Sequence, residues 1–356
     1  MCDLYRRLAE QTRPLLIYGM GNGADKLLAI LADKGIPYAD FFASDGFVRG
    51  HSFHGKRVLS FAEVKEKYGD DIVILLSFAT NRREVLDMLY GMAASHTLLA
   101  PDMPVAGEVL FDSVFAKTHE KELALARSLL ADNTSRTLFD NIVAYKITGD
   151  IRYLQHAHMP IRALYELMPC DHIENCMDLG AYRGDTLAEM MRFFPQMRRA
   201  IALEPDRKNF TKLVRFAEDT KNVEITPVCA AAWSCEGTAL FHESGNRNAS
   251  IMGASYQYRD GAVPLMPPSR AAGNMRIDYL KLDVEGAESE ALRGAREMIM
   301  RDRPTVLLSV YHRSEDLFAL PLQMASLCES YRFYLRRTEC LPAWEIALIA
   351  VPCEKK

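Results

Sequence analysis

Short apolar runs alternate with stretches of helical periodicity along the first hundred residues. Residues 13–19, 36–42, 72–78 and 96–100 have the length and composition of buried strands. Between them, residues 25–34 and 81–92 carry apolar side chains at helical spacing. Strands that alternate with helices are typical of a doubly wound parallel sheet. The pattern predicts a small α/β domain over residues 1–110.

The alternation stops in the next sixty residues. Residues 117–130 and 136–147 have apolar positions at helical spacing, and Asp132 to Ser135 supply capping residues before the second of these helices. Gly149 and Asp150 then end the pattern, and a third short helix is expected after them. We therefore predict a helical connector over residues 111–168, which could serve as a lid or as a dimer surface.

The strand and helix alternation restarts after residue 169 and continues to the end of the chain. Strands are predicted at residues 175–179, 200–203, 223–228, 277–282 and 304–310, and helices at 185–194, 207–219, 289–300 and 320–330. Two last strands, 331–336 and 344–351, are joined by a short connection that suits an antiparallel pair. The stretch 244–274 is rich in Gly, Asn, Ser and Pro and is expected to be a flexible loop. Residues 169–356 thus form a second α/β domain.

Composition and charge narrow the class of partner. The 356 residues include 43 Lys and Arg and 47 Asp and Glu, for a net charge of −4. This balance argues against a general nucleic-acid binder. No apolar run approaches the roughly 18–20 residues that span a bilayer, and no signal peptide is visible. The eight cysteines form no Cys-x-x-Cys pair, which favours a reducing compartment; we expect a cytoplasmic protein.

The clearest chemical motif follows the strand at 175–179. Asp178, Gly180 and Gly184 lie in a turn that runs directly into a helix. Glycines in such a turn let the backbone approach a ligand, and the free N–H groups of the helix face a polar group. The next strand ends in Glu204, where an acid can accept both ribose hydroxyls of an adenosine-containing cofactor.

A second motif follows the strand at 277–282. Asp283 comes at its carboxyl end, where ligands bind in open α/β sheets. Lys281 precedes it inside the strand, where a lysine needs a partner if it is buried. Glu285 and Glu288 come next; the alternative is that they are acids in the first turn of a helix, where the helix dipole favours them, and for Glu288 this explanation is as good as a functional one.

The N-terminal domain has a glycine motif of its own. Gly19, Gly21 and Gly23 follow a strand in the order Gly-x-Gly-x-Gly-Ala, and Asp45 lies 21 residues beyond Ala24. The pattern fits a dinucleotide fingerprint. The domain also resembles the small Rossmann-type domain ahead of sugar acyltransferases. NAD, a sugar nucleotide or another phosphate ligand, and a structural or oligomerising role all remain open.

Four motifs together resemble the FkbM family of S-adenosylmethionine-dependent methyltransferases. They are residues 177–186 (MDLGAYRGDT), 203–206 (LEPD), 280–288 (LKLDVEGAE) and 308–317 (LSVYHRSEDL). The resemblance covers residues 173–353 and implies a class I methyltransferase fold, with a seven-stranded sheet whose last strand is antiparallel. It departs from the family pattern at residues 266–272 (MPPSRAA), where relatives usually carry a Leu-Asp pair, and this puts the acceptor-side loop in doubt.

The resemblance also implies a cofactor site for S-adenosylmethionine. Its expected members are Asp178, Gly180, Ala181, Tyr182, Gly184, Asp185, Thr186, Glu204, Pro205, Asp206, Ala230, Ala231 and Asp283. Glu204 would take the ribose, Ala230 and Ala231 the adenine, and Asp283 the cofactor amino group or the acceptor.

The reaction expected from this resemblance is methyl transfer to a hydroxyl of a sugar, glycan or sugar nucleotide. Methyl transfer needs an aligned acceptor and benefits from a base, for which His312 and Asp283 are the candidates. No metal is predicted, because the spacing of Asp283, Glu285 and His312 defines no ligand set. Two alternatives remain: an NAD(P)-dependent oxidoreductase that uses the N-terminal domain, and a non-catalytic protein that binds S-adenosylmethionine. A homodimer is possible.

Overall fold

The computed structural model describes residues 3–48, 50–240, 262–328 and 330–353. Its N-terminal part is a four-stranded parallel sheet in the order β2-β1-β5-β6. The strands are β1 (Leu15–Tyr18), β2 (Asp40–Phe42), β5 (Val73–Leu76) and β6 (Thr97–Leu99), which confirms the four predicted runs. The two central strands, β1 and β5, are buried at every position, and this explains their unbroken apolar sequence.

Helices pack on both faces of this sheet. The predicted helices are α2 (Asn22–Asp33) and α5 (Arg83–Ser95), and both bury an apolar stripe. Two further helices were not predicted: α1 (Leu4–Glu10) and α4 (Phe61–Tyr68). Each has a local capping signal, because Asp3 caps the first and Ser60 with Glu63 forms a capping box on the second. The short pieces α3 (Asp45–Val48), β3 (Ser52–Phe53) and β4 (Lys56–Arg57) complete the sheet's surroundings.

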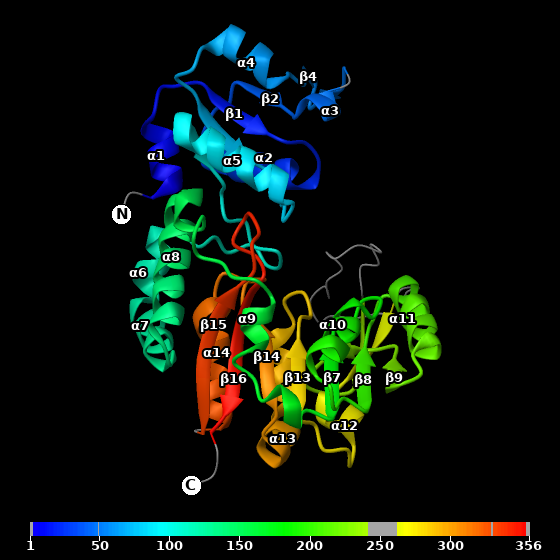
Figure 1. The fold of residues 1–356 in the computed structure, drawn as a ribbon. Coiled ribbons are helices and arrows are strands. Elements are labelled where there is room, and N and C mark those ends of the chain that lie inside the picture. The colour runs from blue at the N-terminus through cyan, green and yellow to red at the C-terminus, as the bar shows by residue number, and fades with distance from the viewer. Residues whose placement is uncertain (1–2, 49, 241–261, 329, 354–356) are drawn as a thin grey trace.

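The helical connector packs against the end of the second domain. Its elements are α6 (Ser113–Thr118), α7 (Glu120–Leu129), α8 (Asn133–Thr148), η1 (Ile151–Tyr153), α9 (Arg162–Tyr165) and η2 (Cys170–His172). The helix expected over 117–130 is divided at His119, whose ring stacks on Phe318 at 5.0 Å. Figure 1 shows α6, α7 and α8 beside the seven-stranded sheet, with α7 along α14 and α8 along β15.

Asp132 fixes the connector to the second domain. Its carboxylate caps α8 by accepting from the backbone N–H of Ser135 at 2.7 Å, and it pairs with Arg336 at 2.6 Å. Although burial acts in the opposite direction, these hydrogen bonds lower the pKa of Asp132 to about 2.

Replacing Asp132 with alanine is expected to lower the free energy of unfolding by about 1–2 kcal/mol, because a helix cap and an ion pair are lost together. Urea denaturation followed by circular dichroism measures this loss. Asp140→Ala is the matched control, since Asp140 lies on the same helix and pairs with Arg127 at the surface. Its expected cost is at most about 0.5 kcal/mol. Equal costs for both variants would contradict the role given to Asp132.

The C-terminal part of the chain contains a seven-stranded sheet in the order β15-β16-β14-β13-β7-β8-β9. Its strands are β7 (Asn175–Leu179), β8 (Arg199–Leu203), β9 (Glu224–Val228), β13 (Tyr279–Leu282), β14 (Thr305–Ser309), β15 (Tyr331–Arg337) and β16 (Ile346–Pro352). Strand β16 runs antiparallel to both of its neighbours, and the other pairs are parallel. Strand β9, which was predicted at 223–228, is at the edge of the sheet and half exposed, and an edge position tolerates its Pro227.

Four helices connect the strands of this sheet: α10 (Asp185–Phe193), α11 (Arg207–Asp219), α13 (Glu288–Asp302) and α14 (Asp316–Leu327). Helix α14 begins four residues earlier than predicted and contains Pro321. No helix among the described residues is long and apolar enough to cross a bilayer.

The expected loop over 244–274 is partly wrong. Residues 262–266 form strand β12 (Ala262–Met266), and residues 268–272 form helix α12 (Pro268–Ala272). Strand β12 pairs with β10 (Ala231–Ala232) and β11 (Gly237–Leu240) in a small separate sheet. Its Val263 and Leu265 pack with Ala231 of β10. This packing and the strand pairing explain why the composition, which is rich in turn-forming residues, wrongly predicted a loop here. Residues 244–261 lie outside the described residues.

The N-terminal part contacts the second domain next to the carboxyl ends of β13 and β14. The backbones of Thr80 and Leu341 exchange two hydrogen bonds, at 2.7 and 2.9 Å. The N–H of Ala106 donates to the carbonyl oxygen of His312 at 2.9 Å. The hydroxyl of Ser314 donates to the carbonyl oxygen of Val109 at 2.6 Å. These bonds hold the two parts together beside the motif residues.

Candidate active site

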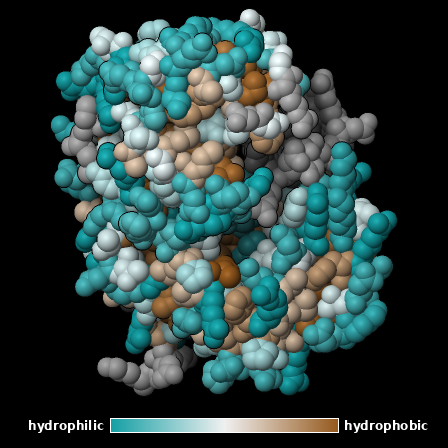
Figure 2. All heavy atoms as spheres, turned by 45° about the horizontal axis from the view of Figure 1, so that its top comes forward, coloured by the Kyte–Doolittle hydropathy of each residue, from teal (hydrophilic) through white to brown (hydrophobic). Residues whose placement is uncertain are grey.

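A cavity of about 510 Å³ lies at the carboxyl ends of the parallel strands. Most of its wall comes from the second domain, and Ala79, Thr80, Asn81 and Val105 add a wall from the N-terminal part. Figure 2 shows the surface hollowed between these two parts of the molecule. The volume is within the range of small-molecule sites, about 300–1,000 Å³.

The glycine turn after β7 forms one side of this cavity. Gly180 has φ of +82°, and a Cβ there would overlap with the carbonyl oxygen of Asp283. Tyr182 has φ of +50° although it is not glycine, and such backbone strain is typical of functional sites. Gly184, with φ of +93°, begins α10 without a side-chain cap. The turn therefore has positive φ angles at three positions, a backbone conformation that residues other than glycine rarely adopt.

Glu204, at the end of β8, is tied to this turn. Its Oε2 accepts from the N–H of Tyr182 at 2.8 Å, and its Oε1 accepts from the N–H of Asp206 at 2.9 Å. Burial raises the pKa of Glu204 to about 7. A carboxylate held rigidly by two backbone donors at the cavity wall suits the recognition of hydroxyl groups.

Lys281 has the partners that a buried lysine requires. Its Nζ lies 3.2 Å from Asp178 Oδ1 and 3.7 Å from Asp283 Oδ2, and it donates to the carbonyl oxygen of Gly180 at 3.2 Å. Burial raises the pKa of Asp178 to about 6 even beside this lysine. The lysine thus joins the two motifs, because it connects the acid of β7 with the acid that follows β13.

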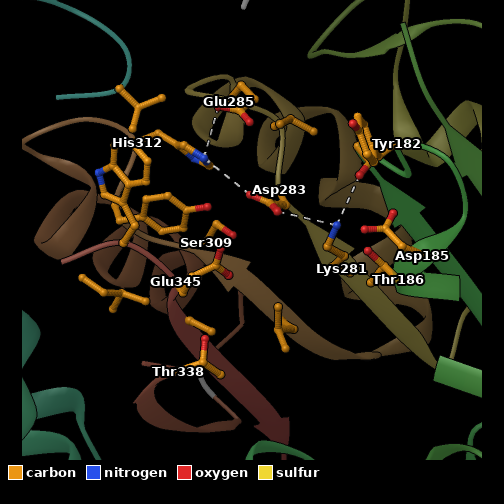
Figure 3. A pocket seen from close by; sticks show the side chains of 18 of the residues that line it. Tyr182, Asp185, Thr186, Lys281, Asp283, Glu285, Ser309, His312, Thr338 and Glu345 are labelled. Carbon is orange, nitrogen blue, oxygen red and sulfur yellow. Dashed lines mark hydrogen bonds and ion pairs between the residues drawn. The ribbon is translucent and has the colours of Figure 1, made fainter. Parts of the chain in front are cut away.

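His312 is fully buried among three carboxylates. Its Nδ1 lies 2.8 Å from Glu288 Oε1, and its Nε2 lies 3.5 Å from Asp283 Oδ1 and 3.6 Å from Glu285 Oε2. Figure 3 shows the imidazole directed between Asp283 and Glu285. Burial acts to lower its pKa, but Glu288, Asp283 and Glu285 together raise the pKa to about 10. The surrounding carboxylates therefore favour the protonated imidazole, which makes His312 the weaker of the two candidate bases.

Glu285 belongs to the cavity wall rather than to a helix. Helix α13 begins only at Glu288, and Glu285 has φ of +54° in the preceding turn. Burial raises the pKa of Glu285 to about 7. The sequence offered a helix first turn as an alternative explanation for both acids, and as an equal one for Glu288. It applies to Glu288 by position, but Glu288 is 1% exposed and contacts His312, so neither acid is a surface helix residue.

Most of the expected site residues line the cavity: Gly180, Tyr182, Asp185, Thr186, Glu204, Pro205, Ala230, Ala231, Asp283 and His312. Four others are packed behind the wall: Asp178, Ala181, Gly184 and Asp206. Asp206 caps α11 through the N–H groups of Lys208 and Asn209. Further lining residues were not predicted, among them Ser309, Tyr311, Thr338, Trp344 and Glu345. Thr338, Trp344 and Glu345 come from the β15–β16 connection, which carries no recognisable motif.

The N-terminal glycine motif has a packing role at two of its three positions. A Cβ on Gly19 or Gly23 would overlap with Ser77, at the end of β5, whereas Gly21 faces open space. Asp45 begins the short helix α3, and its side chain lies outside the described residues. None of these residues lines the cavity described above.

Comparisons with known proteins find one matching family model and several similar structures. The family model described as "Methyltransferase FkbM domain" matches residues 178–335. The structure of methyltransferase FkbM from Methylobacillus flagellatus KT is similar, with a TM-score of 0.71, 20% identity, and coverage of 97% of this chain and 91% of that one. Fibrillarin of Aeropyrum pernix with bound S-adenosyl-L-methionine matches 53% of this chain and 74% of its own, with 13% identity and a TM-score of 0.34. No curated protein matched the sequence.

The structural similarity to the Methylobacillus protein establishes the methyltransferase-like α/β fold, with its mixed sheet, across nearly the whole chain. The family match begins at Asp178 and includes Glu204, Asp283 and His312, the residues that meet in the cavity. Residues 178–335 of this chain therefore match the FkbM methyltransferase domain, within a methyltransferase-like fold.

Proposed function

We propose that the protein transfers a methyl group from S-adenosylmethionine to a hydroxyl oxygen of a sugar, glycan or sugar nucleotide. The observation that carries this proposal is that the glycine turn and Glu204 open into the same cavity as Asp283. We interpret the sheet as that of a class I methyltransferase, and residues 1–110 as a Rossmann-like domain joined to it by the connector.

The residues that we expect to bind the cofactor line one part of the cavity wall. The glycine turn, Asp185 and Thr186 suit the methionine end, Glu204 suits the ribose, and Ala230 and Ala231 suit a flat adenine ring. Asp178 acts through Lys281, which it pairs with behind the wall. S-adenosylmethionine supplies the methyl group and a positively charged leaving group; the chain itself binds and aligns it.

The acceptor side is rich in groups that bind hydroxyls. Ser309, Thr338 and Glu345 offer hydrogen-bonding oxygens, and Tyr311 and Trp344 offer flat apolar faces. A polyhydroxylated ring needs both kinds of contact. The N-terminal residues Ala79 to Asn81 border this side, so the N-terminal domain would help to select the acceptor.

In the reaction, the acceptor oxygen bonds to the methyl carbon as the bond from carbon to sulfur breaks. The electron pair of that bond stays on sulfur, and the hydroxyl proton passes to a base. Of the two expected bases we assign this role to Asp283, because the surrounding carboxylates favour the protonated form of His312 in the chain alone. His312 then orients Asp283, and both remain catalytic-site residues.

The test is calorimetric titration with S-adenosylhomocysteine, followed by a screen of sugars and sugar nucleotides for methylated product. NADH in a parallel titration tests the oxidoreductase alternative through the N-terminal glycine motif. Micromolar binding of S-adenosylhomocysteine and a product methylated at oxygen are expected. Cofactor binding without turnover of any acceptor would favour a non-catalytic binding protein, and binding of NADH alone would reject the proposal.

The affinity for S-adenosylhomocysteine should fall about tenfold between pH 8 and pH 6. Ribose hydroxyls donate to a carboxylate, so the cofactor binds the ionised form of Glu204, whose pKa of about 7 is raised by burial and by Asp206 and Asp178. Below pH 7, the affinity then falls by up to about tenfold for each pH unit. Calorimetry across this pH range measures the slope.

Glu204→Gln is the matched variant, because it keeps the shape and removes the titrating group. It should bind at least tenfold more weakly at pH 8 and lose the pH dependence between pH 6 and 8. A slope that persists in Glu204→Gln would assign the titration to another group.

A further inference from the structure

The imidazole Nε2 of His312 lies at ligand spacing from one oxygen of Asp283 and from one oxygen of Glu285. His312 Nε2 lies 3.5 Å from Asp283 Oδ1 and 3.6 Å from Glu285 Oε2, too far for good hydrogen bonds. Ligand atoms bound to one divalent ion at about 2.0–2.2 Å stand about 3.0–3.6 Å apart. His312 Nε2 and Glu285 Oε2 are buried and have no hydrogen-bond partner among the described residues. A single ion between the three side chains would satisfy them.

Glu288 holds the imidazole in the orientation that such an ion requires. Its Oε1 lies 2.8 Å from His312 Nδ1 and also accepts from the N–H of Val284 at 2.9 Å. Metal-binding histidines usually donate their second N–H to a carboxylate, and this fixes the tautomer and the ring. Nδ1 thus faces Glu288 across this ion pair, and Nε2 faces Asp283 and Glu285. One ligand atom each from Asp283, Glu288 and His312 lie within 4.8 Å of one another.

Carboxyl groups outnumber cationic side chains in the cluster around His312. Asp283, Glu285 and Glu288 contact His312, and Asp316 also interacts with it electrostatically. Lys281 is shared between Asp283 and the more deeply buried Asp178. Four carboxyl groups thus surround one imidazole and one shared lysine, and a bound cation would stabilise their ionised forms.

The cofactor is badly placed to be that counterion. Figure 3 shows Tyr182, Asp185 and Thr186 on one side of Asp283, and Glu285 and His312 on the other. A cofactor held by the glycine turn would place its charge next to the first group. The second group is nearer to the acceptor side of the cavity, beside Ser309.

We propose that Asp283, Glu285 and His312 bind a divalent metal ion, with Glu288 as the positioning residue behind His312. Carboxylate oxygens with one imidazole favour a cation of the Mg²⁺ or Mn²⁺ class. The ion would have open positions toward the cavity, where it can bind the acceptor hydroxyl and lower its pKa. This role in methyl transfer rests on the proposed function, whereas metal binding does not.

The experiment titrates the metal-free full-length protein with Mn²⁺ and follows the free ion by electron paramagnetic resonance. We expect one Mn²⁺ per chain, and an affinity at least tenfold weaker in Glu285→Gln. Glu290→Gln is the matched control, since Glu290 lies on helix α13, shortly after Glu285 in the chain, and pairs with Arg293 away from the cluster. It should bind Mn²⁺ like the unchanged protein. Calorimetry with S-adenosylhomocysteine, run on each variant, checks that the fold and the cofactor site are intact.

Two results would overturn the inference. One is the absence of stoichiometric binding of Mn²⁺ and of Zn²⁺ to protein that binds S-adenosylhomocysteine; His312 would then act only as a cation that holds the carboxylates. The other is Mn²⁺ binding that Glu285→Gln and Asp283→Asn leave unchanged, which would place the ion elsewhere. If the unchanged protein does not bind S-adenosylhomocysteine at all, that result would instead count against the proposed function.

Discussion

Asp283→Asn is expected to lower kcat by about 10²–10⁴-fold at saturating cofactor, acceptor and Mn²⁺, because removal of a general base has an effect of this size. Asparagine keeps the shape of the side chain but cannot take the hydroxyl proton. Asp283 lines the cavity between Lys281 on one side and His312 on the other, so its loss also removes the charge that both face. The measurement is methylated product per unit time, once the acceptor screen has supplied a substrate.

The same variant decides which ligand Asp283 serves. If it faces the acceptor, the Kd for S-adenosylhomocysteine should change by less than about threefold, or about 0.7 kcal/mol. A rise in Kd as large as the fall in kcat would assign Asp283 to the cofactor amino group and contradict its role as base. Asp278→Asn is the control at the opposite end of the strand, where Asp278 accepts from the N–H groups of Glu174 and Asn175. That variant should alter stability and leave kcat unchanged.

The fold was predictable where local sequence and tertiary burial agree. The strands β1 and β5 are buried at every position, and each reads as an unbroken apolar run. Errors occur where tertiary contacts decide. Pro321 favours a helix start near that position, yet α14 begins at Asp316, because Leu317, Phe318 and Leu320 are buried against the connector and core. Similarly, residues 262–266 form strand β12 because they pair with β10 and β11.

The site was predictable up to the residues that carry motifs. Asp283 and Glu204 end strands and follow a recognisable pattern, so their place in the cavity could be expected. The contact between His312 and Glu288 could not, because it depends on where β14 ends relative to the first turn of α13. Nor could the wall formed by Thr80 and Trp344, since their approach depends on the hydrogen bonds between Thr80 and Leu341.

Gly180→Ala should weaken the binding of S-adenosylhomocysteine at least 100-fold, or about 2.8 kcal/mol. The alanine Cβ would overlap with the carbonyl oxygen of Asp283, which is backbone and cannot rotate away. The turn cannot retreat either, because the N–H groups of Gly180 and Ala181 both donate to the carbonyl oxygen of Leu203 at 3.0 Å. The turns after β7 and β13 would have to separate, and the cofactor and catalytic walls of the cavity would move apart.

Backbone strain alone must be distinguished from this collision, since Gly180 also has φ of +82°. Gly273→Ala provides the comparison, because Gly273 has φ of +54° but a Cβ added to it would meet no described atom within 4 Å. It follows α12, away from the cavity. Strain should cost each variant about 1–2 kcal/mol of stability in urea denaturation, whereas only Gly180→Ala should lose affinity. Folded Gly180→Ala that binds S-adenosylhomocysteine within about threefold of the unchanged protein, or about 0.7 kcal/mol, would mean that the close contact of the two turns does not shape the cofactor site.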